Sequence, residues 1–197
     1  MLVNLQGEKR MSKTSSKKYN SWIKFEGSQY ETQTHNVVSV SEQGRTLYIL
    51  NYVRRPSGVK DGATVFVACG YKDIYGISQQ VIIGRGILAG YSADNVVKEE
   101  WIEKYYWMEH FCNYLVLKKF EVLDSIRKNG LLLDQVYSVV GGDTYPSSEG
   151  QNISIKDLRR KHTQKMHLMI TDKATDYINS ELDKLFKLYG VRVFQSE

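Results

Sequence analysis

Cysteine is scarce in this sequence, because Cys69 and Cys112 are the only two among 197 residues. Two distant cysteines provide neither a disulfide framework nor the closely spaced pairs that hold structural zinc. The N-terminal segment also lacks the apolar core that a secretory signal needs. We therefore expect a reduced, cytoplasmic protein without a metal or cofactor, in which both cysteines are buried as small hydrophobic residues.

Long apolar runs are also missing. No uninterrupted stretch approaches the roughly 20 apolar residues that cross a bilayer, so we expect no membrane partner. Hydrophobic residues make up 42% of the chain and charged residues 25%, which is typical of a globular protein. A chain of 197 residues can bury one sizeable core without needing a second domain. We expect a single domain over residues 21–197.

Basic residues are concentrated at the N-terminus. The formal net charge is +5, and most of it comes from five basic residues that precede position 19, against Glu8 alone. Residues 1–20 are therefore expected to form a disordered basic tail. Such a tail is either a solvated leader or a source of salt-dependent attraction to phosphate.

Two apolar runs rich in β-branched residues, 64–68 and 81–88, flank a loop at 69–76 that mixes aromatic, charged and glycine residues. The pattern predicts two strands joined by a turn, and the glycines at 84, 86 and 90 indicate bulges or a tight bend. We interpret the pair as the wall of a small β-barrel and expect function in or beside the loop, because loops on rigid scaffolds commonly bind ligands.

Other segments supply further strands and helices. Strands are expected at 21–26, 37–40, 46–53, 113–117 and 119–123. Residues 93–110 should be partly helical, and 172–189 carry one apolar stripe that ends at Gly190, which predicts a helix. Ser154 and Asp157 form a capping-box-like start to a basic segment over 154–167. Residues 131–140 fit a strand or a helix equally well.

The order of these elements resembles the PUA-like superfamily, especially the EVE branch and its YTH and ASCH relatives. The resemblance covers residues 21–123 and rests on the aromatic strand around Trp22, the stretch DGATVF at 61–66 and the stretch IGRGI at 83–87. The family strand begins Gly-Asp-x-Val-Phe, whereas this chain has Asp-Gly. The resemblance implies an α+β fold, a small mixed β-barrel with flanking helices, here with a C-terminal helical elaboration. It also implies a concave pocket that receives a flipped or unpaired base, often a modified one.

Candidate site residues fall into two groups. By the resemblance, Trp22 and the loop around Tyr71 are pocket candidates. The family pattern places no third aromatic residue here, and the aromatic segment offers candidate walls by residue type alone; the base-binding candidates are Trp22, Tyr71, Asp73, Trp101 and Trp107. Trp22 can equally be a core residue at one end of the barrel. Candidates for the nucleic-acid backbone are Arg54, Arg55, Arg85, Arg159, Arg160 and Lys161. The alternative for these cations is ordinary solvated surface charge.

Three functions follow from these features. The leading hypothesis is a nucleic-acid-binding module that recognises a modified, flipped or unpaired base, and that serves as a specificity component for an effector nuclease or another nucleic-acid-processing protein. The second is a nucleic-acid hydrolase that uses histidines and carboxylates such as His162 and Asp73, although no metal-protease, deaminase, nucleophile-elbow or phosphate-loop motif is present. The third is a protein-interaction module built on exposed tyrosines.

Overall fold

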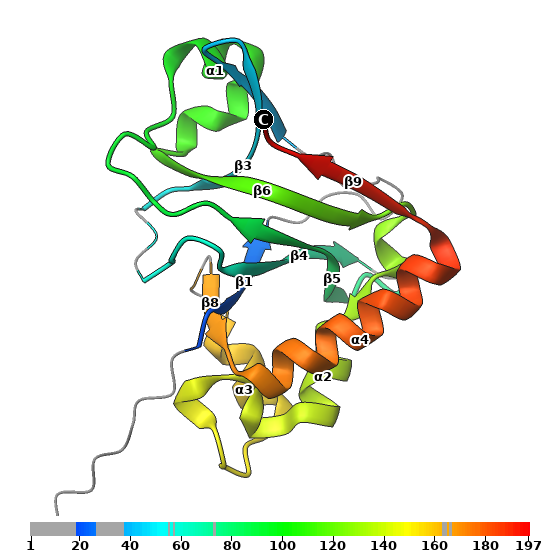
Figure 1. Cartoon of the computed structure of the whole chain (residues 1–197). Coiled ribbons are helices and arrows are strands. Elements are labelled where there is room, and N and C mark those ends of the chain that lie inside the picture. Colours follow the sequence, from blue (N-terminus) through cyan, green and yellow to red (C-terminus); the bar gives the residue numbers. More distant parts are fainter. Residues whose placement is uncertain are drawn as a thin grey trace, which may run out of the picture.

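The computed structural model describes residues 19–26, 38–54, 56, 58–72, 74–162, 165 and 167–197. Within them the chain forms nine strands and four α-helices, which confirms the α+β class (Figure 1). The strands are β1 (Ser21–Glu26), β2 (Val38–Glu42), β3 (Arg45–Tyr52), β4 (Thr64–Lys72), β5 (Ser78–Leu88), β6 (Asn113–Leu123), β7 (Leu131–Leu132), β8 (His167–Ile170) and β9 (Val191–Gln195). The α-helices are α1 (Glu99–Lys104), α2 (Leu133–Val140), α3 (Ile155–His162) and α4 (Asp172–Tyr189), and the 3₁₀ turns are η1 (Tyr106–His110), η2 (Arg127–Asn129), η3 (Gly141–Thr144) and η4 (Pro146–Ser148).

All nine strands belong to one sheet. Its order is β2-β3-β6-β5-β4-β1-β8, while β7 pairs with β5 and β9 pairs with β6. β1 lies parallel to β4, and the other pairs are antiparallel. β6 is long enough to pair with β3 along its first half and with β9 along its second half.

The predicted small β-barrel is wrong in one respect, because in the part of the chain that the structure describes the sheet does not close into a barrel. Closure requires the two end strands to share a hydrogen-bond ladder, but β2 and β8 are opposite ends of the strand order. The outer carbonyls of β2 are satisfied by side chains instead. Trp101 Nε1 donates to the Ser41 carbonyl at 3.3 Å, and the Tyr105 hydroxyl donates to the Ser39 carbonyl at 3.0 Å. Helix α1 therefore occupies the edge at which another strand would close the sheet.

The β4–β5 pair contains the predicted irregularities. The β4–β5 register shifts between Val67 and Ala68, and the β5–β6 register shifts between Ile87 and Leu88. A Cβ at Gly84 would lie 2.5 Å from the Glu121 carbonyl oxygen, so glycine is required where β5 crosses closest to β6.

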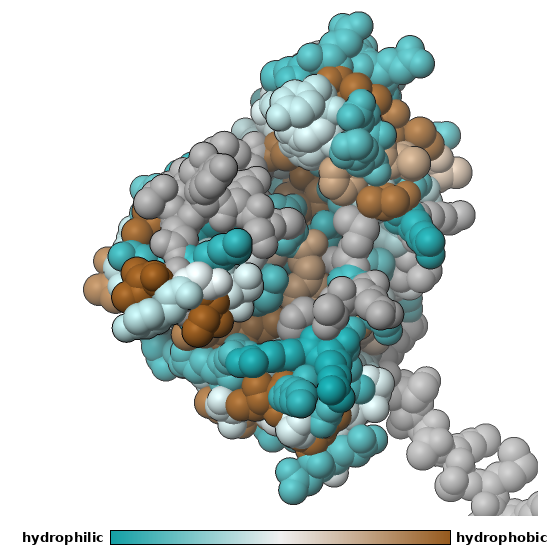
Figure 2. All heavy atoms as spheres, turned by 180° about the vertical axis from the view of Figure 1, so that it is seen from behind, coloured by the Kyte–Doolittle hydropathy of each residue, from teal (hydrophilic) through white to brown (hydrophobic). Residues whose placement is uncertain are grey.

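Side chains alternate across β4 and separate two cores. Phe66 and Ala68 pack beneath α2, α3 and α4, which cover one face of the sheet (Figure 1). Val65, Val67 and Cys69 face the other side, in a cluster that includes Trp22. Figure 2 shows the molecule hollowed between its upper and lower parts, with hydrophobic side chains at the bottom of the recess. A third cluster lies beneath α1 and η1 and includes Trp101 and Met108.

The predicted helix signals are present in the structure. Thr171 caps α4 by accepting a hydrogen bond from the Ala174 amide, and Gly190 ends the helix with a φ of 88°. The Ser154 hydroxyl accepts from the Asp157 amide at the start of α3. Of residues 131–140, which fitted a strand or a helix equally well, 131–132 form strand β7 and 133–140 form helix α2.

The expectation that both cysteines are buried is wrong for one of them. Cys69 is buried in β4, whereas Cys112 is exposed. Cys112 lies between η1 and β6, where its amide binds the Tyr52 carbonyl and leaves the side chain on the surface. In the described residues no helix is long and apolar enough to cross a membrane.

Gly84→Ala tests the close approach of β5 to β6. The added methyl would overlap the Glu121 carbonyl, so the free energy of unfolding should fall by about 1–3 kcal/mol in urea denaturation. Gly90→Ala is the control, because its Cβ would meet Asp61 only at an ordinary contact distance of 3.4 Å. Equal unfolding midpoints for the two variants would contradict this packing.

Candidate functional site

An open hollow of about 570 Å³ lies beside β8, where β1, η4 and α3 meet it. We call it the β8 hollow. It forms because β8 pairs antiparallel with β1, with Trp22 opposite Met169, while α3 leads along the chain toward β8. It is lined by Trp22, Tyr145, Pro146, Ser147, Arg160, Lys161, Lys165, His167, Leu168 and Met169. Three of the sequence-predicted site residues, Trp22, Arg160 and Lys161, therefore meet in one place.

Trp22 belongs both to the core and to the wall of this hollow. Its side chain is 7% exposed and packs in the cluster on the hollowed side of the sheet. The His167 ring lies against it, with 5.1 Å between ring centroids. Its Nε1 is buried and has no acceptor among the described residues. The two interpretations of Trp22, core residue and pocket wall, thus describe the same side chain.

The lining of the β8 hollow is cationic. Arg160, Lys161 and Lys165 contribute positive charge, and none of the described lining residues is acidic. Arg160 is largely exposed and binds Asp157 one helical turn before it, at 3.1 Å. Lys161 Nζ donates to the Ser147 hydroxyl at 3.1 Å, which holds the ammonium toward η4. An exposed ion pair of the Arg160 type is weak and can exchange partners.

A second group of polar side chains continues from the hollow into the core. His167 also contacts the edge of the Tyr52 ring, at 5.5 Å between centroids. Lys24, the register partner of His167, lies with Nζ 5.0 Å from the centroid of Tyr52 and donates to the Phe25 carbonyl at 3.2 Å. Burial lowers the pKa of Lys24. Burial also lowers the pKa of His167, and the charges of Lys24 and Lys165 add to this effect.

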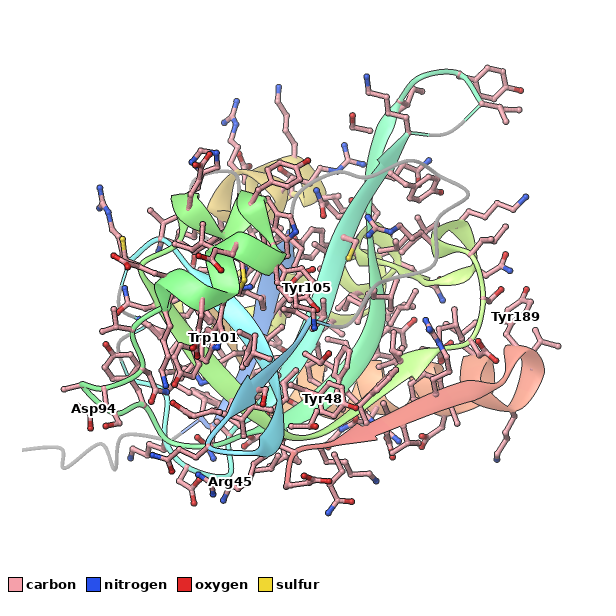
Figure 3. The ribbon with its side chains drawn as sticks, turned by 90° about the horizontal axis from the view of Figure 1, so that it is seen from above. Arg45, Tyr48, Asp94, Trp101, Tyr105 and Tyr189 are labelled. Carbon is pink, nitrogen blue, oxygen red and sulfur yellow. The ribbon has the colours of Figure 1, made fainter. Side chains whose placement is uncertain are left out.

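The other aromatic candidates lie elsewhere. Figure 3 shows Trp101 and Tyr105 between α1 and the β2–β3 hairpin, where Trp101 stacks edge-on against Tyr114. Trp107 packs on Phe111 in the same region. Tyr71 shares the Trp22 cluster but does not line the hollow, and its hydroxyl faces Gln79. Asp73 lies outside the described residues.

Among the described residues, the remaining candidate cations do not line the β8 hollow, and two of them are paired with carboxylates of this chain. Arg85 binds Glu121, Asp183 and Asn179 beneath α4. Arg159 forms a two-pronged pair with Asp134 of α2. Arg54 is exposed after β3, and Arg55 lies outside the described residues. The described residues of the loop between β4 and β5 do not line the β8 hollow.

No family model, curated protein or solved structure matches this chain.

The site residues that the sequence predictions omitted include Lys165 and His167 in the lining of the hollow, and Lys24 opposite His167. The signal for Lys24 was its spacing, because residue 24 is two positions after Trp22 and falls on the same face of a strand. His167 was visible only as one member of a basic cluster. Its position opposite Lys24 comes from the pairing of β8 with β1.

Lys24→Met tests whether the buried ammonium is a cost to the fold. Removing a buried charge that has one hydrogen bond should raise the free energy of unfolding by about 1 kcal/mol near neutral pH. Because the pKa of Lys24 is below its ordinary 10.5 in the fold, the unfolded chain binds more protons between the two values, and wild-type stability rises with pH across that interval. The difference between variant and wild type should shrink as the pH approaches 10.5.

Urea unfolding at several pH values measures this difference. Lys187→Met, on the exposed side of α4, is the control and should change stability little. A Lys24→Met variant that is less stable than the wild type at every pH would show that the ammonium is a net stabiliser.

Proposed function

We propose that this chain binds nucleic acid, holding one unpaired or flipped nucleotide of a strand in the β8 hollow. The observation that carries the proposal is the composition of the lining, which combines the Trp22 indole with three cations and no described carboxylate. Cations favour phosphate, and aromatic faces favour bases. A volume of about 570 Å³ lies in the range of small-ligand sites.

Different parts of the hollow suit different parts of a nucleotide. Arg160 and Lys161 extend from α3 at the margin, where a phosphate can replace the exposed contact of Arg160 with Asp157. Lys165 adds a third cation between α3 and β8. On the sheet side, the wall consists of the Trp22 and His167 rings and the apolar Met169 side chain, and such a wall suits the face of a base. A wall of this kind accepts modified bases as readily as ordinary ones, provided that the modification fits.

A PUA-like relationship is part of this proposal. The features that favour it are the aromatic first strand beside the bulged β4–β5 pair and the hollowed face of the sheet (Figure 2). A module that binds one nucleotide and catalyses no reaction fits the role of a specificity component. In that role, an effector nuclease or another nucleic-acid-processing protein would catalyse the reaction on the bound strand.

The double variant Arg160→Ala/Lys161→Ala tests the phosphate contacts. Affinity for single-stranded oligonucleotides should fall, and the slope of log K against log salt should become shallower by about 1.4 if both residues contact phosphate. Fluorescence polarisation across a salt series measures both quantities. Lys184→Ala/Lys187→Ala is the matched control, because Lys184 pairs with Glu181 at i,i+3 as Arg160 pairs with Asp157, but it lies outside the hollow. Equal losses in the two double variants would refute a specific site.

The pH dependence of binding tests His167. Its pKa is lowered in the free protein by burial and by the charges of Lys24 and Lys165, and a phosphate nearby would raise it. The complex then binds more protons than the free protein, so affinity should rise as the pH falls between about 8 and 5. An oligonucleotide containing only phosphodiesters avoids titration of the ligand phosphate in this range.

His167→Gln should flatten this profile while it retains a hydrogen-bonding side chain. A wild-type affinity that does not change with pH, or an unchanged profile in the variant, would place His167 outside the ligand contacts.

A further inference from the structure

The outer edge of β9 is a row of backbone groups that no strand covers. Among the described residues β9 pairs with β6 alone, on one side. Figure 1 shows β9 beside β6 at the margin of the sheet, directly after α4. An edge strand of this kind can accept a further strand, and the backbone hydrogen bonds between the two then supply affinity.

Two hydrogen bonds at the ends of the β6–β9 ladder fix which backbone groups face β6. The Asp124 amide donates to the Gly190 carbonyl at 3.1 Å, and the Ser196 amide donates to the Lys118 carbonyl at 3.3 Å. The register between these two bonds is continuous, and the direction of the N–H and C=O groups alternates along a strand. The even-numbered residues of β9 therefore face β6, and the odd-numbered residues face outward.

The outward residues of β9 are Val191, Val193 and Gln195. No described residue binds their N–H or C=O groups. Their side chains are exposed as well, 42% for Val191 and 55% for Val193. These side chains lie on the α4 face of the sheet, because the neighbouring Phe194 packs against the Trp22 cluster on the other face. The row thus offers hydrogen-bonding groups and apolar side chains, and it carries no charge.

The one charged residue of β9 is turned back onto its own molecule. Arg192 Nε lies 3.3 Å from an Asp124 carboxylate oxygen, and the Arg192 guanidinium lies 5.9 Å from the centroid of the Phe194 ring. Edge strands that must stay unpaired commonly carry charged side chains, proline or a bulge. The outward positions of β9 have none of these.

We propose that β9 pairs antiparallel with β9 of a second copy of this chain, about a twofold axis at Val193. Pairing about this axis uses every outward residue, because Val193 meets its own counterpart and Val191 lies opposite Gln195. On the other face, Arg192 of each copy lies opposite Phe194 of the other, which forms a cation–aromatic pair twice. The edge is therefore complementary to itself. The proposal is independent of the nucleotide site.

Other antiparallel registers fit less well. A twofold axis at Arg192 would place two guanidinium groups opposite each other, and like charges in that position destabilise a strand pair. An axis at Phe194 would place Val191 opposite Glu197, whose amide already donates to the Thr46 carbonyl. Only the proposed axis avoids both conflicts and keeps the whole edge paired.

Sedimentation velocity of the full chain over a concentration series tests for the dimer. A pair of five-residue strands buries a small interface, so we expect dissociation in the micromolar range. Val193→Lys places two ammonium groups opposite each other at the axis and should raise the dissociation constant roughly tenfold or more. Val139→Lys is the matched control, because Val139 is 59% exposed but lies on α2. It should leave the dissociation constant unchanged.

Val193→Glu adds a test of the axis itself. This variant alone should stay monomeric, whereas an equimolar mixture with Val193→Lys should associate, because opposite charges then meet at the axis. Amide hydrogen exchange of the wild type locates the contact. The Val193 amide should become protected as the concentration rises, while the Arg192 and Phe194 amides, which face β6, are protected throughout.

The outcomes decide the proposal in either direction. A wild-type chain that is monomeric at every concentration of the series overturns it, and so does a dimer that forms equally well in Val193→Lys and Val139→Lys. A mixture of the two charged variants that fails to associate rules out an axis at Val193. If a charged variant does not fold, as judged by circular dichroism, the concentration dependence of Val193 amide exchange in the wild type decides.

Discussion

The pairing of β8 with β1 is the interaction on which the β8 hollow depends. β8 returns to the sheet after α3, and it places His167 opposite Lys24 and Met169 opposite Trp22. Because side chains alternate along a strand, a register slip of one residue would turn this set toward the helices. The apolar residues on the other face, including Ile23 and Ile170, pack in the core beneath α2 and α4 and prevent that slip. One face of β1 therefore holds the register while the other carries the polar groups.

This division explains how the fold tolerates polar groups that weaken it. Lys24 is 3% exposed, and Trp22 Nε1 has no acceptor in the described part of the chain. Each opposes folding, because desolvated polar groups lose their contacts with water. The fully buried core beneath α2, α3 and α4 includes Phe66, Ile82, Leu158 and Ile178 and supplies apolar burial that offsets this cost.

The sequence predicted the elements with strong local signals. Helix α4 followed from its apolar stripe and its terminal glycine, and the β4–β5 irregularities followed from glycines within a strand pattern. The open sheet could not be predicted, because no local pattern reveals that Trp101 and Tyr105 satisfy the carbonyls of β2. For the site, Trp22, Arg160 and Lys161 were identifiable by residue type, but their meeting depends on contacts between residues more than 100 positions apart. In the sequence, Arg85 and Arg159 look as suitable for binding phosphate as Arg160 does. Only the structure shows that Glu121 and Asp134 already pair with them.

The contact between α1 and β2 limits strand pairing through the β2 edge between separate molecules of this chain. An edge strand with vacant carbonyl and amide groups is a template on which a strand of another molecule can align, and natural sheets protect such edges. Here the protection comes from an indole and a phenol that occupy the carbonyls of Ser41 and Ser39. Contacts of this kind protect an edge from strand addition, so Trp101 and Tyr105 have a role in the fold that is distinct from ligand binding.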